Sequence, residues 1–514
     1  MSNFMTAMKN EMDNRISITE NGAVGYATTG KKLLDMNFAV ASLRKASEQE
    51  IVDKFIDAYY ENPMLAVKWL FYASDVREGL GERRTFRVIM NYLAEQHTDI
   101  ALAVIKLIPE YSRWDNLITL IECGNVEVVN EALLIIKTQL VLDKMNMRED
   151  KPISLLAKWM PSENASSKDT KRRATLIRNT LEWDERRYRK TLSALRKYLD
   201  VVECKMSAKE WENIDYSAVP SKANIKYSNA FMRNDEERRR AYLESLKKGE
   251  TKINAGVLFP HDVVHKYATG YWGRRIGSYD EALEQMWKSL KDIGNIENTI
   301  VVADGSGSMT ITVDNNSSVC ALEIANALAI YCGERCSGEF KDKYITFSNR
   351  PQLVDFTNAN SLHDKLEIAL RHNEVANTNI EAVFDLILNT AINNHMTQDE
   401  IPQNVLILSD MEFDSCATTN NRGRFNATLF DAIADKYAQY GYKLPRLVFW
   451  NLASRTGTIP VKQNDMGVAL VSGFSANIMK LVLNGELDPY KALVKELNSD
   501  RYKAVEEAVG TLVS

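Results

Sequence analysis

The sequence predicts a multidomain chain, with an all-α helical part in residues 1–295 and a C-terminal α/β part with a doubly wound, largely parallel sheet in residues 296–514. The first observation behind this division is that helical patterns follow one another up to about residue 295, with few strand signals. The second is that short, fully apolar runs then alternate with helical patterns. The third is length, because 514 residues are too many for one ordinary core.

Capping signals mark the starts of the first helices. Ser47 and Glu50 form a capping box before apolar residues at helical spacing, and Asn62-Pro63 places a cap and a proline at the start of a second helix. Further helices are expected at 83–96, 99–107, 113–122, 126–142, 152–160, 170–200 and 207–213, the last opened by Ser207 and Glu210. Short strands are expected near 16–27. Consecutive helices joined by short turns favour an α-solenoid of paired helices.

The character of the sequence changes near residue 295. The runs NTIVVAD (298–304) and VLILSD (405–410) are typical of strands that helices bury on both faces. Further strands are expected at 344–347, 352–356, 446–452 and near 467–472, and helices at 318–336, 361–371, 379–394, 425–440 and from 476. Strands and helices that alternate in this way predict the doubly wound, largely parallel sheet.

Composition excludes several classes of protein. Hydrophobic residues make up 45% and charged residues 26%, which is the balance of a soluble globular chain and not of a disordered or collagen-like one. The longest apolar runs are far shorter than the roughly 20 residues that span a bilayer. The N-terminus has no apolar segment of a signal peptide. Six cysteines without a CxxC pair suit reduced thiols, so we expect a cytoplasmic protein.

Two close pairs of potential zinc ligands are better explained as structural residues. Cys332 and Cys336 lie one helical turn apart in an apolar stretch, and a structural zinc site would need four converging ligands. His261 and His265 have the spacing of metal ligands on a helix, but the sequence between them lacks the glutamate of an HExxH motif. A structural or capping role is therefore favoured over a metal for both pairs.

Polar side chains follow two central strands of the predicted sheet. Asp304, Ser306 and Ser308 lie in the Gly-rich loop DGSGSM after the first strand, and Asp410 ends the later strand. Thr378 stands at the start of a helix between them. Open α/β sheets bind ligands beyond the carboxyl ends of their strands, so we expect these residues to converge. Such oxygen ligands suit Mg²⁺ or Mn²⁺, and two carboxylates with three hydroxyls leave a coordination position open for an acidic ligand.

Two alternatives concern the same loops. Asp304 and the two serines could instead cap a helix. Glu412 and Asp414 follow closely after Asp410, and solvated side chains are favoured for both over a role beside the site.

The loop DGSGSM, a threonine before a later helix and an aspartate that ends the next strand resemble the metal-ion-dependent adhesion site of von Willebrand factor A domains. This resemblance implies a Rossmann-like von Willebrand A fold for residues 296–514. It also implies a set of metal ligands, with the serines and the threonine nearer the ion and the aspartates acting partly through water. These ligands are Asp304, Ser306, Ser308, Thr378 and Asp410.

The helical part carries a second resemblance. The stretches ENGAVGYATTG (20–30), ASDVREGLGERRTFR (73–87) and YSRWDN (111–116) resemble the TROVE module of Ro ribonucleoproteins. The stretch WENIDYSAVPSKA (211–223) is similar to bacterial, plant and phage relatives of Ro, and the resemblance spans about residues 20–485. It implies HEAT-like helical repeats in a ring that a von Willebrand A domain closes. Such rings hold single-stranded RNA ends in a basic central channel and structured RNA on the outer surface.

A basic segment is the candidate RNA-binding surface. Residues 298–514 carry 18 Lys and Arg against 26 Asp and Glu, whereas residues 168–197 carry 11 against 4. Basic side chains interleaved with Trp183 and Tyr188 suit contact with the RNA backbone and stacking on bases. The expected RNA-binding residues are Lys168, Lys171, Arg172, Arg173, Arg186, Arg187, Arg83 and Arg84. The alternatives are a solvated helix face for the segment and structural ion pairs for the last two arginines.

Motifs of catalysis do not occur in the sequence, which has no GxxxxGK[ST], GxSxG or HExxH, so we expect a binding protein and not an enzyme. The leading hypothesis is a Ro-like RNA-binding protein, in which a helical ring binds single-stranded or structured non-coding RNA. Its Mg²⁺-binding von Willebrand A domain would bind a protein partner through an acidic residue. The alternative is a metal-dependent protein–protein adaptor or assembly protein, encoded by a phage for example, that binds no RNA. A chelatase-like partner of an ATPase would rest on the fold alone.

Overall fold

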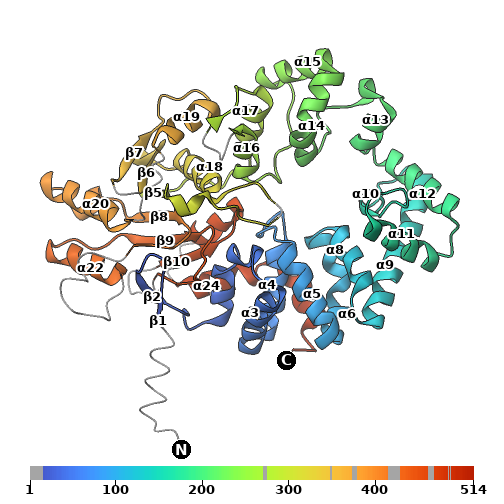
Figure 1. Cartoon of the computed structure of the whole chain (residues 1–514), viewed down its shortest axis with the longest axis horizontal. Helices are drawn as coiled ribbons and strands as arrows, with labels where there is room; N and C mark the ends of the chain where they lie inside the picture. The colour runs from blue at the N-terminus through green and yellow to red at the C-terminus, as the bar shows by residue number, and fades with distance from the viewer. Residues whose placement is uncertain are drawn as a thin grey trace, which may run out of the picture. The chain divides into compact units, whose positions relative to one another are not determined.

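A computed structural model gives the fold of the chain (Figure 1). It describes residues 16–269, 275–315, 317–347, 350–372, 379–414, 429–460, 468–483, 486 and 488–513. In this part of the chain, no helix is both long enough and apolar enough to cross a bilayer.

Contacts divide the chain into two compact units, and each unit is built from two separate segments. The α/β unit consists of Met1–Asn62 and Ala255–Glu496, and the helical unit consists of Pro63–Asn254 and Leu497–Ser514. The chain thus starts in the α/β unit, passes through the helical unit, returns once to the α/β unit and ends in the helical unit. The division of the sequence into one domain of residues 1–295 and another of residues 296–514 stays a prediction.

The α/β unit is built on a six-stranded sheet with the order β10-β9-β8-β5-β6-β7. Its strands are β5 Thr299–Asp304, β6 Lys343–Phe347, β7 Gln352–Asp355, β8 Asn404–Ser409, β9 Arg446–Asn451 and β10 Val468–Ser472. All neighbouring pairs are parallel except β6 and β7, which are antiparallel. The connection between these two strands is too short for a crossover, so the edge strand must turn back. The expectation of a largely parallel sheet is confirmed.

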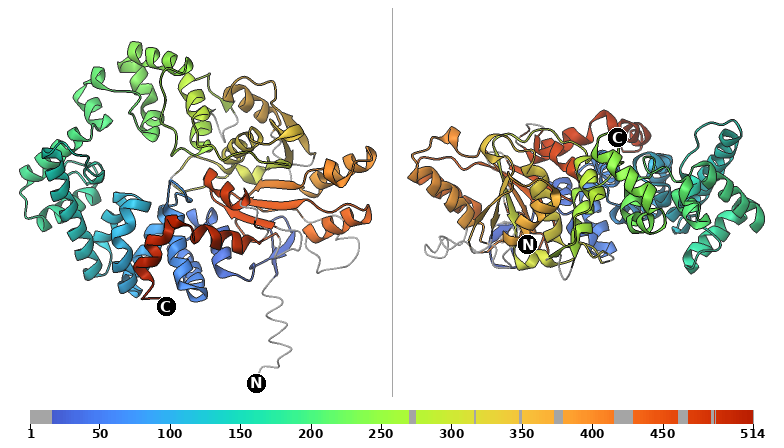
Figure 2. Two further views of the ribbon diagram at one scale, coloured as in Figure 1. Left: turned by 180° about the vertical axis from the view of Figure 1, so that it is seen from behind. Right: turned by 90° about the horizontal axis from the view of Figure 1, so that it is seen from above.

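Helices cover both faces of this sheet, as the burial of the central strands requires. Every residue of β5 is buried, although successive side chains point to opposite faces. Helix α18, Ala321–Gly333, lies against β5, β6 and β8 and is buried along its whole length, which its sequence explains because all of its residues except Glu323 and Asn326 are apolar or small. Helices α20, Glu381–Asn393, and α23, Met479–Leu483, lie against β6 and β10. Figure 2 shows these strands flanked by helices in two further views.

The remaining elements of the α/β unit come from both of its segments. Its other helices are α2 Lys32–Phe38, α3 Glu48–Glu61, α16 Pro260–Tyr267, α17 Glu281–Lys288, α19 Leu362–His372, α22 Leu429–Gln439 and α24 Pro489–Leu497. The hydroxyl of Ser47 accepts a hydrogen bond from the amide of Glu50 at the start of α3, as expected. Two short hairpins complete the unit, β1 Ile16–Ile18 with β2 Val24–Tyr26 and β3 Ala268–Thr269 with β4 Arg275–Ile276.

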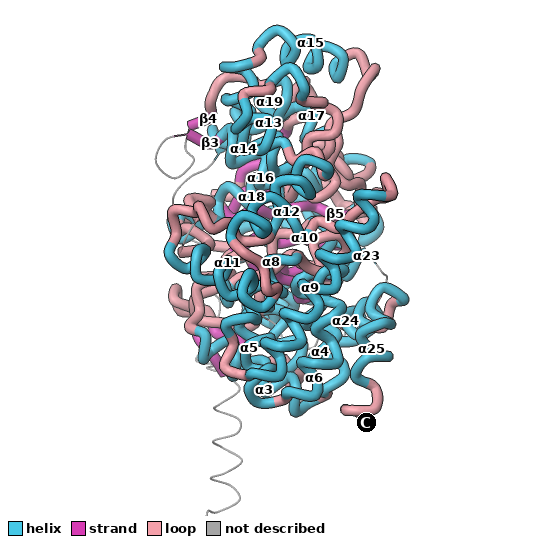
Figure 3. The backbone as a smooth tube through the Cα atoms, turned by 90° about the vertical axis from the view of Figure 1, so that its right-hand side faces the viewer, coloured by secondary structure: helices cyan, strands magenta, loops and turns pink. Residues whose placement is uncertain are grey.

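The helical unit contains helices and loops but no strand in its described residues (Figure 3). Its helices are α4 Pro63–Ser74, α5 Arg84–Gln96, α6 Thr98–Val104, α7 Ile108–Tyr111, α8 Trp114–Thr119, α9 Val126–Arg148, α10 Leu156–Trp159, α11 Lys168–Thr180, α12 Glu185–Tyr198, α13 Val202–Ala208, α14 Ser221–Asn234, α15 Glu236–Lys247 and α25 Lys503–Val509. Consecutive helices contact each other at α4 with α5, α5 with α6, and α14 with α15. A helical N-terminal region followed by an α/β sheet is therefore what the structure has.

Two helices differ from the sequence-based expectation. The single helix expected over 170–200 is split into α11 and α12, because Glu182 adopts a positive φ of 55° and the side chain of Asp184 caps α12. The capping box of Ser207 and Glu210 is wrong, because α13 already ends at Ala208. The hydroxyl of Ser207 donates to the carbonyl of Glu203 within α13 instead.

Candidate metal site and basic surface

The first predicted ligand, Asp304, is fixed at the end of β5 by two hydrogen bonds. Its Oδ1 accepts from the amide of Ser306 at 2.9 Å, and its Oδ2 accepts from the hydroxyl of Ser409 at 2.6 Å. Ser409 is the last residue of β8, the parallel neighbour of β5. Asp304 and Asp410 therefore lie at the same carboxyl edge of the sheet, as the topology predicts.

Two hydroxyls join the two carboxylates at this edge. The Oγ atoms of Ser306 and Ser308 lie 2.9 Å apart, and the side chain of Ser308 is hydrogen-bonded to Asp410. Neither serine caps the short 3₁₀ helix Gly307–Thr310 with its side chain, which disfavours the capping alternative. The structure thus brings together four of the five predicted ligands. Thr378 lies outside the described residues.

This cluster carries more negative than positive charge, with the guanidinium of Arg455 as the one cation that the described side chains place near it. Burial, together with the nearby charge of Asp410, raises the pKa of Asp304 to about 7. Burial also raises the pKa of Asp410, although the hydrogen bond from Ser308 opposes the rise. Among the described residues, none donates a hydrogen bond to the buried Oδ2 of Asp410. Two buried carboxylates, two hydroxyls and a carboxylate oxygen without a donor are a ligand set that fits Mg²⁺ or Mn²⁺.

A metal here would depend on hydroxyl as well as carboxylate ligands. Within the described part of the chain, no three His, Cys, Asp or Glu side chains gather in a way that could hold a metal ion. The sequence signal for this edge was the pair of serines in DGSGSM and not an acidic cluster.

Glu412 was expected to be solvated, and this expectation is wrong. Its side chain is fully buried, and its carboxylate accepts from the amides of Arg455 at 2.7 Å, Thr456 at 2.9 Å and Glu20 at 2.8 Å. Backbone amides from two distant segments thus replace the water that a carboxylate normally binds. Asp414 is half-buried and forms a β-bridge with Gly22. Both residues hold the hairpin β1–β2 against the edge of the sheet that carries the candidate site.

The histidine and cysteine pairs are structural, as favoured from the sequence. His265 lies between Glu323 and Ser318, with its Nδ1 2.6 Å from Oε2 of Glu323. His261 packs edge-on against Phe474. Cys332 and Cys336 are free and buried, and burial raises the pKa of the Cys336 thiol to about 12.

Several of the predicted RNA-binding arginines are engaged in ion pairs within the helical unit. The guanidinium groups of Arg172 and Arg173 both lie 2.6 Å from the carboxylate of Glu122. Arg83 lies 3.9 Å from Asp115, and Arg84 begins α5. The contact of Arg83 agrees with the structural alternative for that residue, whereas the pairing of Arg172 and Arg173 with Glu122 is a structural role that neither reading of the basic segment included.

The two aromatic residues of the basic segment cannot stack on bases in this structure. Tyr188 is fully buried, with its hydroxyl donating to the carbonyl of Pro161, and Trp183 is only 9% exposed. The expectation that they contact RNA bases is wrong. The signal was in the sequence, because Tyr188, Leu192 and Leu195 share one apolar face of α12.

Other cations of the segment remain exposed. Lys168, Lys171, Arg186 and Lys190 are exposed and form no ion pair with another described residue. Arg187 is exposed and lies over the ring of Trp183. On α12, a shallow hollow of about 450 Å³ is lined by Arg186, Arg189, Lys190 and Ser193. This face offers positive charge without aromatic rings.

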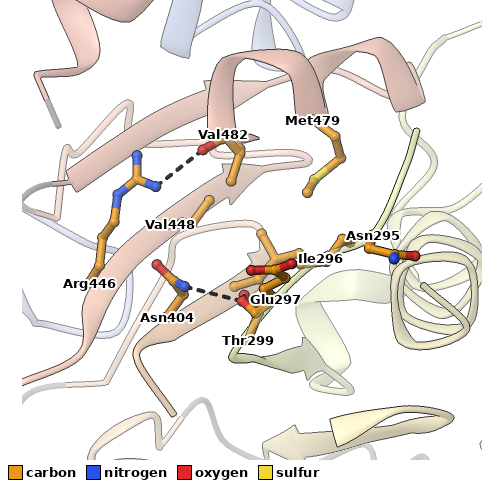
Figure 4. A pocket seen from close by; sticks show the side chains of 10 residues that line it. Asn295, Ile296, Glu297, Thr299, Asn404, Arg446, Val448, Met479 and Val482 are labelled. Carbon is orange, nitrogen blue, oxygen red and sulfur yellow. Dashed lines mark hydrogen bonds between the residues drawn. The ribbon is translucent and has the colours of Figure 1, made fainter. Parts of the chain in front are cut away.

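The amino edge of the sheet carries a cavity of about 300 Å³ that the sequence did not indicate (Figure 4). Arg446, at the start of β9, donates to the carbonyls of Val482 at 3.1 Å and Glu486 at 3.0 Å. The guanidinium thereby binds one carbonyl in the last turn of α23 and one beyond its end, which accounts for its position. Asn404, the partner of Arg446 in the register of β8 and β9, also lines the cavity, and its side chain donates to the carbonyl of Glu297 at 3.4 Å.

Comparisons with known proteins match the chain to two family models and to a viral protein. Residues 298–510 match the family model described as "Domain of unknown function (DUF7788)", and residues 19–113 and 163–302 match "Domain of unknown function (DUF2828)". An uncharacterized protein of Acanthamoeba polyphaga mimivirus is 30% identical over 508 residues, which cover 92% of this chain and 85% of the viral protein. The chain therefore belongs to the same family as this mimivirus protein.

Proposed function

We propose that this protein is a Ro-like RNA-binding protein of the cytoplasm, and not an enzyme. The helical unit binds RNA, and the α/β unit binds Mg²⁺ or Mn²⁺ and, through it, a protein partner. The same proposal assigns HEAT-like repeats to the helical unit, a ring as their arrangement, and a von Willebrand A domain to the α/β unit.

The convergence of Asp304, Ser306, Ser308 and Asp410 at one edge of the sheet carries this proposal. The von Willebrand A resemblance implies this set, and two buried carboxylates beside a single, partly exposed guanidinium leave negative charge that a divalent cation would balance. Ser306 and Ser308 would hold the ion directly, with Asp304 and Asp410 supplying the negative charge. A bound divalent cation would supply an open coordination position for the carboxylate of a partner.

The RNA part is supported by the TROVE resemblance and by the exposed cations of α11 and α12. Lys168, Lys171, Arg186 and Lys190 can contact phosphates without first breaking an ion pair. Binding through them would follow the backbone of the RNA and would weaken steeply with salt. Because Trp183 and Tyr188 are buried, we expect little preference for particular bases.

A second candidate function is a metal-dependent protein–protein adaptor that binds no RNA. The burial of both aromatics and the pairing of Arg172 and Arg173 with Glu122 favour it. In that case the exposed cations would bind an acidic protein surface.

Charge reversal separates the two functions. The test replaces Lys168, Lys171, Arg186 and Lys190 with Glu and measures the binding of fluorescent single-stranded RNA and of an RNA hairpin by anisotropy at two salt concentrations. The control replaces four exposed lysines elsewhere in the helical unit with Glu, namely Lys137, Lys247, Lys248 and Lys252. The RNA proposal expects a large loss only in the first variant. If the wild-type protein binds neither RNA at low salt, the adaptor function replaces it.

A further inference from the structure

A built-in cation lies beside the candidate metal ligands. The guanidinium of Arg455 is 3.5 Å from Oδ2 of Asp410, the buried oxygen that receives no hydrogen bond from the described residues. The same guanidinium nitrogen forms an ion pair with the carboxylate of Glu20 in the hairpin β1–β2. All three residues belong to the α/β unit.

The backbone holds Arg455 in this place. Its amide donates to Oε1 of the buried Glu412, and the amide of Glu20 donates to Oε2 of the same carboxylate. One buried side chain therefore fixes both partners of the ion pair relative to Asp410. The side chain of Arg455 itself is 32% exposed, so its guanidinium can move without disturbing the core.

Arg455 lies near charged groups of both signs. Asp410 and Glu20 both attract the guanidinium, and the positive charge of Arg455 acts on Lys45, where burial and then this charge lower the pKa. A cation held between Asp410 and Glu20 can satisfy either carboxylate. Glu20 is half-solvated, whereas Asp410 is fully buried and depends more on a nearby cation. The guanidinium of Arg455 is the only positive group that the described side chains place within 4 Å of Asp410.

We propose that Arg455 sets the metal affinity of the Asp304–Asp410 site, and that Glu20 tunes it by neutralising the charge of Arg455. The inference rests on the proposed metal site. Arg455 repels an incoming divalent ion, and Glu20 weakens this repulsion by neutralising the guanidinium. The two residues thus change the affinity in opposite directions, and the hairpin β1–β2 becomes part of the metal site although it supplies no ligand. Arg455 and Glu20 are positioning residues in this scheme.

Calorimetric titration of the metal-free, full-length protein with Mg²⁺ tests this proposal. Removing a positive charge a few ångströms from the ion in Arg455→Gln should lower the Kd about tenfold, given a partly solvated environment. Glu20→Gln should raise the Kd severalfold. In the double variant, Glu20→Gln should have much less effect than in the wild-type background, because its influence passes through Arg455. Glu367→Gln and Arg371→Gln, which remove another exposed ion pair of the same unit, serve as matched controls.

The outcomes separate this inference from the proposed metal site. If the wild type binds Mg²⁺ and Arg455→Gln binds it equally well, the inference is overturned while the metal site stands. If Glu20→Gln weakens binding equally with and without Arg455, Glu20 acts directly on the ion and its proposed role is wrong. If Arg455→Gln binds Mg²⁺ and the wild type does not, Arg455 excludes the ion, which is the strongest form of the inference. If no variant binds Mg²⁺, the metal site and the inference both fall.

Discussion

The hydroxyl of Ser409, the last residue of β8, donates a 2.6 Å hydrogen bond to the carboxylate of Asp304, the last residue of β5. Both side chains are buried, and the two strands are parallel neighbours. The bond ties the ends of two strands together and orients Asp304 without any ion. The candidate site is therefore preorganised by the sheet itself.

We expect Ser409→Ala to destabilise the protein by about 1–3 kcal/mol, because it leaves a buried carboxylate oxygen without its donor. Urea unfolding without divalent ions measures this change in the free energy of unfolding. Ser193→Ala, at an exposed position of α12, is the control and should change stability very little. Equal unfolding midpoints for Ser409→Ala and the wild type would show that water replaces the hydroxyl at no cost.

The raised pKa of Asp304 predicts a pH dependence of stability. The folded-state pKa, about 7, lies above the value of 3.8 expected for the unfolded chain, so the folded protein binds more protons between these values. Stability without metal should therefore fall as the pH rises from about 4 to about 7. Asp304→Asn removes this cost and should gain about 2 kcal/mol relative to the wild type between pH 5 and pH 8.

Urea unfolding in EDTA at pH 5 and pH 8 checks this expectation. The same measurement with Mg²⁺ is a second test. Because Mg²⁺ binds the charged carboxylate, it should stabilise the wild type more at pH 8 than at pH 5. A wild type whose stability relative to Asp304→Asn is the same at both pH values would contradict the raised pKa.

The sheet and its carboxyl edge could be predicted because their signals are local. Strands β5 and β8 are continuous apolar runs, and a parallel sheet places the residues that follow them at one edge. Asp304 and Asp410 could therefore be paired from sequence. The break between α11 and α12 was missed, because a non-glycine residue with a positive φ, such as Glu182, leaves little trace in the sequence.

The surroundings of the site could not be predicted, because they depend on contacts between distant segments. Glu412 follows the end of a predicted strand and looks solvated, yet its donors come from Glu20 and from the loop at Arg455. Neither partner has a fixed spacing from Glu412 that a pattern could reveal. The same holds for the ion pair of Arg455 with Asp410.

Glu412→Gln tests the anchoring role of this buried carboxylate. Glutamine keeps the size but replaces one acceptor oxygen with a donor that faces backbone amides, so we expect a loss of about 2–4 kcal/mol. Urea unfolding measures the loss, and hydrogen exchange should show faster exchange at the amides of Glu20, Arg455 and Thr456. Glu339→Gln, at an exposed position of the same unit, is the control. Unchanged exchange at these amides would mean that the carboxylate does not hold the hairpin.

The pairing of Arg172 and Arg173 with Glu122 makes a prediction that distinguishes a structural from an RNA-binding role of these arginines. Glu122→Gln removes their shared partner and should cost less than about 1 kcal/mol of stability, because the ion pairs are partly solvated. If the basic face binds RNA, freeing Arg173, while Arg172 keeps its 3.8 Å contact with Asp169, should raise the RNA affinity about threefold and steepen the dependence of log Kd on log salt concentration by about one. Anisotropy titrations at several salt concentrations measure both quantities, with Glu237→Gln as an exposed control on α15. An unchanged affinity and an unchanged slope would assign both arginines to the structure of the helical unit alone, and would leave Lys168, Lys171, Arg186 and Lys190 to bind the RNA backbone.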